Sequence, residues 1–211
     1  MTAYIPQFTL PHEVFASAPA SILLPITLGA AVGYATRPKQ TTTTYNLLQQ
    51  PPLRPPPSVF GPAWTFLYGV TGYAAHRAIG GALALAPPAS ASAAQSLGLP
   101  LPLAHRAAAL YTAQLGLNLA WMPLFFGARR PALALADIAA LLGLNGYLAW
   151  LFFAPPAQGG LGDSVAGWCY VPYVAWLGFA AYLNVGVGYL NGWDISDEAL
   201  LRKEAAGKKK A

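Results

Sequence analysis

The amino-acid sequence predicts an all-α integral membrane protein, built as a bundle of five transmembrane helices. Charged residues make up 9% of the chain and hydrophobic residues 55%, whereas a soluble domain has about 25% charged residues. Five nearly charge-free segments each approach the roughly 20 residues that a helix needs to cross a bilayer. Buried helices of a large soluble protein are the alternative, but five of them in 211 residues would leave no amphipathic shell to cover them.

The five predicted spans form one domain at 18–191. Pro25 interrupts the first span, which is the shortest, and Asp137 in the fourth is the one carboxylate inside any span. The spans are predicted at 18–36, 59–80, 105–127, 131–154 and 165–191. The other predicted segments are an N-terminal segment (1–17), a first loop (37–58), an Ala/Pro-rich loop (81–104) and a polar, basic C-terminal tail (192–211).

The distribution of basic residues predicts how the bundle is oriented. With five spans, the first loop, the third loop and the C-terminus share one side of the membrane, and this side carries ten of the twelve Lys and Arg residues. The other side carries Arg106, and Arg77 lies near a helix end. Because cytosolic loops of membrane proteins are enriched in Lys and Arg, the C-terminus is predicted to be cytosolic.

Three of the predicted spans carry aromatic and polar residues at helical spacing, which places them on one face of each helix. Two interpretations are open. The polar side chains could hydrogen-bond between helices while the aromatic rings fill the bundle, or the stripes could line a cavity for a flat, mostly apolar ligand with polar edges. The stripes are Trp64, Tyr68 and Gly72; Tyr111, Gln114, Asn118, Trp121 and Phe125; and Tyr173, Trp176, Ala180 and Asn184.

Other candidate features are isolated. An ionisable group inside a span is a candidate functional residue, so Asp137 is one; the other interpretation, which the sequence favours, is an inward structural carboxylate hydrogen-bonded to a neighbouring helix. Gly29-x-x-x-Gly33 would allow close helix approach or a homodimer. With a single cysteine and three scattered histidines, no metal and no cofactor is expected, and nothing in the sequence points to a nucleic-acid partner.

Three blocks of the sequence resemble the signature blocks of the translocator protein family (TspO/MBR), also called peripheral benzodiazepine receptors. They are PPLRPPPSVFGPAWTFLYG, LYTAQLGLNLAWMPLFFGARRPALALAD and VPYVAWLGFAAYLN, and the resemblance covers roughly residues 18–191. It implies a five-helix bundle whose pocket opens toward the cytosol under the first loop. In that arrangement Pro51, Pro52 and Pro55–Pro57 stiffen a lid, and Pro62 lies near the start of the second span.

The resemblance also implies which residues contact a ligand. Trp64, Tyr68, Asn118, Trp121 and Trp176 match pocket positions of the family. Tyr45 matches a tyrosine of the first loop, whereas Thr44 and Leu53 stand where tryptophans are usual. Together with the stripe residues, the predicted ligand-binding set is Tyr45, Trp64, Tyr68, Gln114, Asn118, Trp121, Phe125, Tyr173 and Trp176.

Members of this family bind porphyrins such as protoporphyrin IX, and animal members also bind cholesterol and benzodiazepine-type ligands. The animal cholesterol motif needs a basic residue within about five residues of a tyrosine; here Tyr189 is followed by none before Arg202. The resemblance therefore implies a receptor or carrier for porphyrins first and for sterols second, in contact with the lipid bilayer of the mitochondrial outer membrane.

Two other functions stay open at this point. One is a light-dependent porphyrin-degrading enzyme, in which Trp64 and Trp176 match the tryptophans implicated in bacterial relatives, and for which no other catalytic residue is expected. The other is a transporter of sterols or other lipids.

Overall fold

The computed structural model describes residues 8–36, 48–84, 101–196, 198–199 and 201–202. Within these residues the chain is helical and contains no β-strand. The main elements are α1 (His12–Ala16), α2 (Ala18–Ala35), α4 (Pro57–Ala74), the π-helix η1 (Ala75–Gly80), α5 (Gly81–Ala84), α7 (Leu101–Met122), the π-helix η2 (Pro123–Gly127), α8 (Pro131–Phe153), the 3₁₀-helix η3 (Pro156–Gln158) and α9 (Ser164–Leu190).

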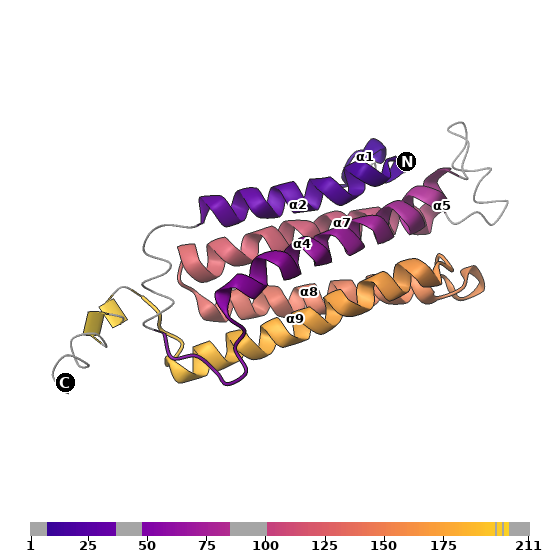
Figure 1. Ribbon diagram of the computed structural model, residues 1–211. Helices are drawn as coiled ribbons and strands as arrows, with labels where there is room; N and C mark the ends of the chain where they lie inside the picture. The colour runs from indigo at the N-terminus through magenta and orange to yellow at the C-terminus, as the bar shows by residue number, and fades with distance from the viewer. Residues whose placement is uncertain (1–7, 37–47, 85–100, 197, 200, 203–211) are drawn as a thin grey trace, which may run out of the picture.

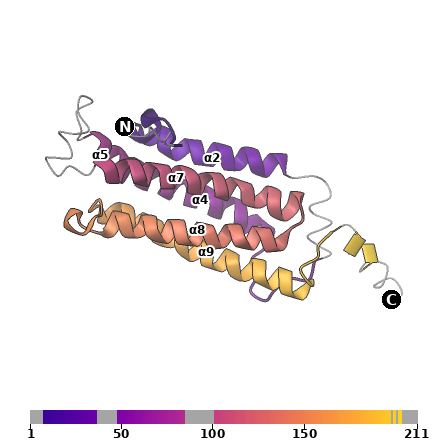
Figure 2. The same cartoon turned by 180° about the vertical axis from the view of Figure 1, so that it is seen from behind.

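Helices α2, α4, α7, α8 and α9 lie side by side along one long axis, as both ribbon views show (Figures 1 and 2). Helix α8 packs against α7 and α9, and α4 packs against α2 and α9. The N-terminal helix α1 lies at the same end of the bundle as α5, and the C-terminal residues lie beyond the other end (Figure 1). The polar and aromatic faces of α4, α7 and α9 therefore meet inside one bundle.

Three of these helices, α2, α8 and α9, are long and apolar enough to cross a membrane. The predicted spans 59–80 and 105–127 are helical as well, but they carry many of the polar side chains and are not among these three. Helical residues also lie at both ends of the segment 81–104, which the sequence predicted as a loop. The all-α, multi-pass character agrees with the prediction, while the count of five spans stays a prediction.

One prediction about proline was wrong. Pro62 was expected near the start of the second span, but α4 begins at Pro57, so Pro62 lies inside the helix. The reason is that Pro57 itself opens the helix, where a missing N–H costs least. Pro123 begins η2, and a proline that cannot donate to the preceding turn is a common cause of such local widening.

The interior of the bundle combines large buried rings, such as Tyr111 and Phe152, with small side chains. Ala74, Ala75, Ala107 and Ala166 are fully buried, and small residues let helix backbones approach closely in membrane proteins. At Gly72 helices α2 and α4 approach closely, because a Cβ there would overlap the backbone carbonyl of Ser21. Large apolar side chains also cover the outside, as expected of a surface that faces lipid; they include Leu23, Phe66, Leu133, Trp150, Trp168, Val171 and Val185.

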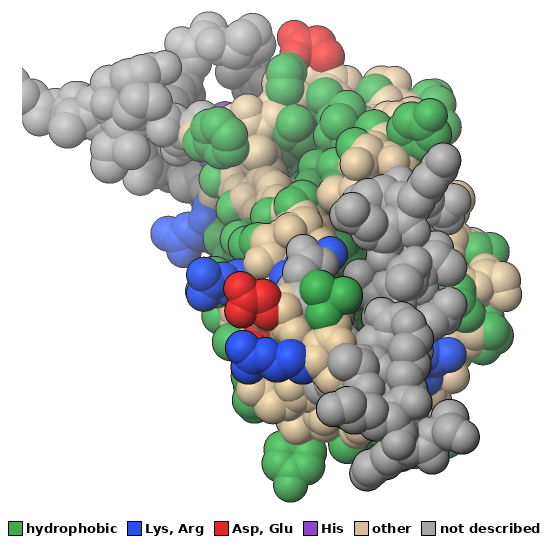
Figure 3. All heavy atoms as spheres, turned by 90° about the vertical axis from the view of Figure 1, so that its left-hand side faces the viewer, with side chains coloured by type: hydrophobic (Ala, Val, Ile, Leu, Met, Phe, Trp, Pro, Cys, Tyr) green, Lys and Arg blue, Asp and Glu red, His purple; other side chains and the backbone are tan. Residues whose placement is uncertain are grey.

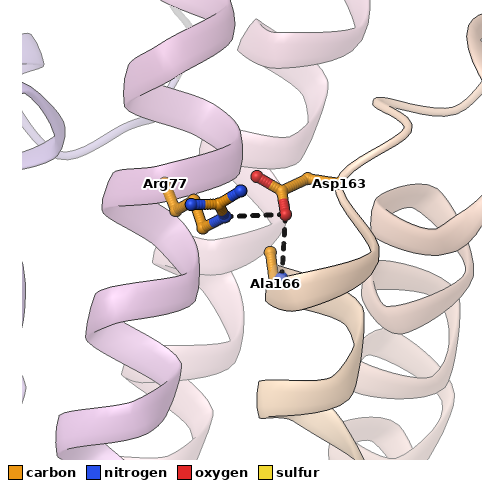
Figure 4. A network of polar contacts seen from close by, with 3 residues as sticks. All are labelled: Arg77, Asp163 and Ala166. Carbon is orange, nitrogen blue, oxygen red and sulfur yellow. Dashed lines mark hydrogen bonds and ion pairs between the residues drawn. The ribbon is translucent and has the colours of Figure 1, made fainter.

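The two ends of the bundle differ in charge. The end that faces the viewer in Figure 3 carries basic side chains among hydrophobic ones; the described basic residues of the segments at this end are Arg54, Arg129, Arg130 and Arg202. At the opposite end, Arg77 Nε donates to Asp163 Oδ1 at 2.9 Å, and the same oxygen caps α9 by accepting from the Ala166 N–H at 3.0 Å (Figure 4). This ion pair joins η1 to the start of α9.

Candidate functional site

All the predicted ligand-binding residues except Tyr45 lie in the part of the chain that the structure describes. Tyr45 and Thr44 fall within 37–47, outside the described residues. Among the described residues, no group of three or more His, Cys, Asp or Glu side chains could hold a metal ion. The candidate site is therefore built from aromatic and neutral polar side chains, together with one buried carboxylate, that of Asp137.

Four of the predicted residues form a chain of hydrogen bonds that joins α4, α7 and α9. The Tyr68 hydroxyl donates to Asn118 Oδ1, and Asn118 Nδ2 donates to the Tyr173 hydroxyl at 2.7 Å. The Tyr173 hydroxyl in turn donates to Gln114 Oε1 at 3.1 Å. We call these four residues the Tyr173 network. Gln114, Asn118 and Tyr173 are buried and Tyr68 is half-buried, so the predicted interhelical hydrogen bonding is present.

Aromatic rings surround one side of the Tyr173 network. The ring of Trp64 lies 5.5 Å from that of Tyr68 and 6.4 Å from those of Tyr173 and Trp176, measured between centroids. Phe60, which the sequence reading missed, adds an edge-to-face contact with Trp176 at 6.1 Å. We call these five residues the Trp64 cluster. Trp64 and Trp176 are only half-buried, so part of each side chain remains accessible.

Trp121 and Phe125 belong to a different group of rings. They stack at 5.1 Å with an interplanar angle of 19°, and Phe126 lies edge-on to Trp121 at 6.0 Å. This Trp121 cluster also packs against Leu48, Ala134, Val187 and Ile195. The ring contacts therefore divide the predicted site residues between two clusters, a division that spacing along single helices could not have shown.

The described end of the first loop is attached to the C-terminal end of α9. The Gln49 N–H donates to Asn191 Oδ1 at 3.1 Å, and Asn191 Nδ2 donates to the Gln49 carbonyl at 2.9 Å. The Tyr182 hydroxyl donates to the Pro52 carbonyl at 2.8 Å. Leu53 follows, 83% exposed and with a positive φ of 63°. The loop thus enters α4 from a fixed point on α9.

Asp137 and Asn184 are buried residues of α8 and α9, two helices that pack against each other. Asn184 Nδ2 donates to the Pro131 carbonyl at 2.9 Å, but Asn184 Oδ1 and Asp137 Oδ2 have no hydrogen-bond partner among the described residues. The interpretation of Asp137 as a carboxylate hydrogen-bonded to a neighbouring helix is thus not supported. Asn184 was visible in the sequence as a stripe residue, yet its unpaired oxygen was not.

A cavity of about 370 Å³ lies elsewhere, between η1, α5 and the start of α9. Arg77, Asp163 and Ser164 supply its polar lining, and none of the predicted ligand-binding residues lines it. Its place at the end of the bundle next to the ion pair separates it from the Tyr173 network, so it is not the predicted ligand site.

These features define the class: an all-α, multi-pass membrane protein whose helices enclose polar and aromatic side chains. Comparison with known proteins then gives the family. The chain matches the TspO/MBR family over residues 21–190 and belongs to that family. Membership supports a role in binding ligands within a membrane.

Individual relatives are similar over most of their length. The translocator protein homolog of Schizosaccharomyces pombe is 40% identical over 188 residues, which cover 86% of this chain and 99% of that protein. The translocator protein of Homo sapiens is 35% identical over 155 residues, covering 71% and 76%. The tryptophan-rich sensory protein of Cereibacter sphaeroides is 34% identical over 147 residues, covering 70% and 76%.

Proposed function

We propose that this protein is a membrane receptor or carrier that binds porphyrins such as protoporphyrin IX at the Trp64 cluster. The observation that carries the proposal is the meeting of half-buried indole rings from α4 and α9 with the Tyr173 network. A flat tetrapyrrole has a large apolar face and a few polar edges, and sites of this composition suit such ligands. Sterols and benzodiazepine-type ligands are the next classes that the same rings would accept.

Binding would use the network without dismantling it. Asn118 Nδ2 carries two hydrogens, and its bond to Tyr173 uses one of them. The second hydrogen is left to donate to a polar edge of the ligand, while the Tyr68 hydroxyl keeps its bond to Asn118. Stacking on Trp64 and Trp176 would then supply most of the affinity, because aromatic pairs contribute about 0.5–1.5 kcal/mol each beyond buried area.

The membrane arrangement that goes with this proposal has five spans: α2, α4 with η1, α7 with η2, α8 and α9. The concentration of basic residues at one end supports a cytosolic C-terminus. The mitochondrial outer membrane is our proposed location. This location rests on the resemblance to animal members of the family. The lipid bilayer would surround the five spans.

The experiment is a titration of the purified protein in detergent with protoporphyrin IX, first in the dark and then under light. A binding protein quenches tryptophan fluorescence while the Soret band of the porphyrin keeps its intensity. Trp64→Ala should weaken binding about tenfold because a stacking face is lost. Absence of saturable quenching would overturn the porphyrin proposal and return the question to sterols.

A light-dependent porphyrin-degrading enzyme is the second candidate. The observation that favours it is the edge-to-face contact of Trp64 with Trp176 at 6.4 Å, which brings the two implicated tryptophans together. Loss of the Soret band under light in the wild-type protein, together with its retention in Trp176→Phe, would place this candidate first. An intact band in both proteins would remove it.

A further inference from the structure

Two hydrogen-bond acceptors are buried without a donor between α8 and α9. Asp137 is 7% exposed and Asn184 is 2% exposed. Among the described residues, Asp137 Oδ2 and Asn184 Oδ1 accept no hydrogen bond. The amide nitrogen of Asn184 is held by the Pro131 carbonyl, which fixes the side chain and leaves its oxygen as the free end.

The two acceptors lie beside the Trp121 cluster. Asp137 follows Ala134 by one helical turn on the buried face of α8, and Asn184 precedes Val187 by one turn on the buried face of α9. Ala134 and Val187 both pack in the Trp121 cluster. In the α7–α8 hairpin, Trp121 and Asp137 are equally far along the chain from Arg129, so they lie at a similar depth in the bundle.

Nothing in the described part of the chain balances this carboxylate. Asp137 makes no ion pair with a Lys, Arg or His residue that the structure describes. An ionised carboxylate inside a membrane bundle is costly unless a cation or several donors meet it, and an unpaired buried amide oxygen adds a further cost. An occupant that donates hydrogen bonds would satisfy both oxygens, and one that carries positive charge would also balance the carboxylate.

We propose that Asp137, Asn184 and the rings of the Trp121 cluster bind the ammonium group of a lipophilic amine. The ammonium N–H groups donate to Asp137 Oδ2 and Asn184 Oδ1, and the charge lies against aromatic rings, which attract cations. The indole N–H of Trp121 is also buried without an acceptor, so a hydroxyl or ether oxygen next to the amine completes the set. The apolar part of the amine packs on Trp121 and Phe125.

This ligand class differs from the porphyrins of the proposed function, whose acidic side chains Asp137 would repel. The proposal also rests on different residues, because the Trp64 cluster contains neither Asp137 nor Asn184. A buried water is the main alternative occupant, since one water can donate to two acceptors and accept from one donor. The experiment therefore has to distinguish an amine from a water as the occupant of this site. It also has to distinguish binding at this site from binding at the Trp64 cluster.

The experiment compares two fluorescent probes that differ in charge, 1-pyrenemethylamine and 1-pyrenemethanol, by titration of the full-length protein in one nonionic detergent. The wild-type protein is expected to bind the amine about tenfold more tightly than the alcohol, the usual range for a charge-assisted hydrogen bond. Asp137→Asn should abolish that preference without changing the affinity for the alcohol. Asn184→Ala should reduce the preference about threefold, because one neutral acceptor is lost.

Glu198→Gln is the matched control, because it removes one carboxylate that is 85% exposed and lies in the tail. It should keep the full preference for the amine. Equal affinity of the wild-type protein for both probes would overturn the proposal and assign the acceptors to water. This comparison uses the wild-type protein alone, so it does not depend on whether a variant folds. An undiminished preference in Asp137→Asn would overturn it as well. Porphyrin affinity should be unchanged in Asp137→Asn, so loss of either ligand can be assigned to its own site.

Discussion

The Tyr173 network and the pair Asp137–Asn184 are both buried polar groups between helices of one bundle, yet they differ in completeness. In the network, the hydroxyls of Tyr68 and Tyr173 and the amide oxygens of Asn118 and Gln114 each have a hydrogen-bond partner on another helix. In the pair, one oxygen of each side chain has none among the described residues. The first region is thus satisfied within the bundle itself, whereas the second leaves two acceptors unpaired in the part of the chain that the structure describes, which is the basis of the proposed amine site.

The difference teaches how to interpret polar residues inside a membrane. A buried polar group costs free energy unless it is paired. Hydrogen bonding between helices therefore explains the residues of a complete network without a ligand. An incomplete one needs a further partner, which can be a water or the ligand proposed above. Stripes of Asn, Gln and Trp look alike in the sequence, and the hydrogen-bond partners are what separate the two cases.

The largest expected effect comes from breaking the complete network at its centre. Tyr173→Phe leaves the Asn118 amide without its acceptor and the Gln114 oxygen without its donor. The free energy of unfolding should fall by about 2 kcal/mol, because two buried groups lose their partner. Unfolding in SDS titrations measures this change. Tyr189→Phe, at a position 77% exposed, is the control and should leave stability unchanged; equal stability of the two variants would contradict the role of the network.

The network can also be broken from outside. Gly29 of α2 contacts the ring of Tyr68, and a Cβ at this position would overlap the ring. Gly29→Ala should push Tyr68 away from Asn118 and cost about 1–2 kcal/mol through strain and the lost bond. Gly33, on the same helix with open space around it, supplies the control Gly33→Ala. A loss of stability in both variants would point to helix α2 itself instead of Tyr68.

The smallest expected effect belongs to the incomplete pair. Asp137→Asn without ligand should leave the free energy of unfolding unchanged or raise it by up to about 1 kcal/mol, because the variant removes a buried charge that has no partner. Thermal unfolding followed by circular dichroism is the measurement. A loss comparable to that of Tyr173→Phe would show that Asp137 already has a stabilising partner and that the two regions do not differ.

The sequence predicted the helical membrane class well, because long charge-free segments have few other solutions. It also predicted that Tyr68, Gln114, Asn118 and Tyr173 belong to the interior, since helical spacing places them on inward faces. The start of α4 was misjudged, because Pro57 and Pro62 are both acceptable first residues of a helix and only packing decides between them.

The division of the site into two clusters could not be predicted. Asn118 and Trp121 follow one another on a single stripe of α7, yet their side chains bond to Tyr173 and stack on Phe125 respectively. Which neighbour each side chain meets depends on how α7 packs against α8 and α2, and that information lies in distant parts of the chain. The unpaired oxygen of Asn184 was beyond prediction for the same reason.

The central claim, that a flat ligand binds at the Trp64 cluster, is tested most directly by a matched pair of tryptophan substitutions on α9. Trp176 belongs to the cluster, whereas Trp168 is 66% exposed and contacts Phe153 toward the other end of the helix. The measurement is the Kd for protoporphyrin IX in detergent, in the dark. Trp176→Ala should weaken binding about tenfold and Trp168→Ala less than about twofold. Equal affinities in the two variants would contradict the account.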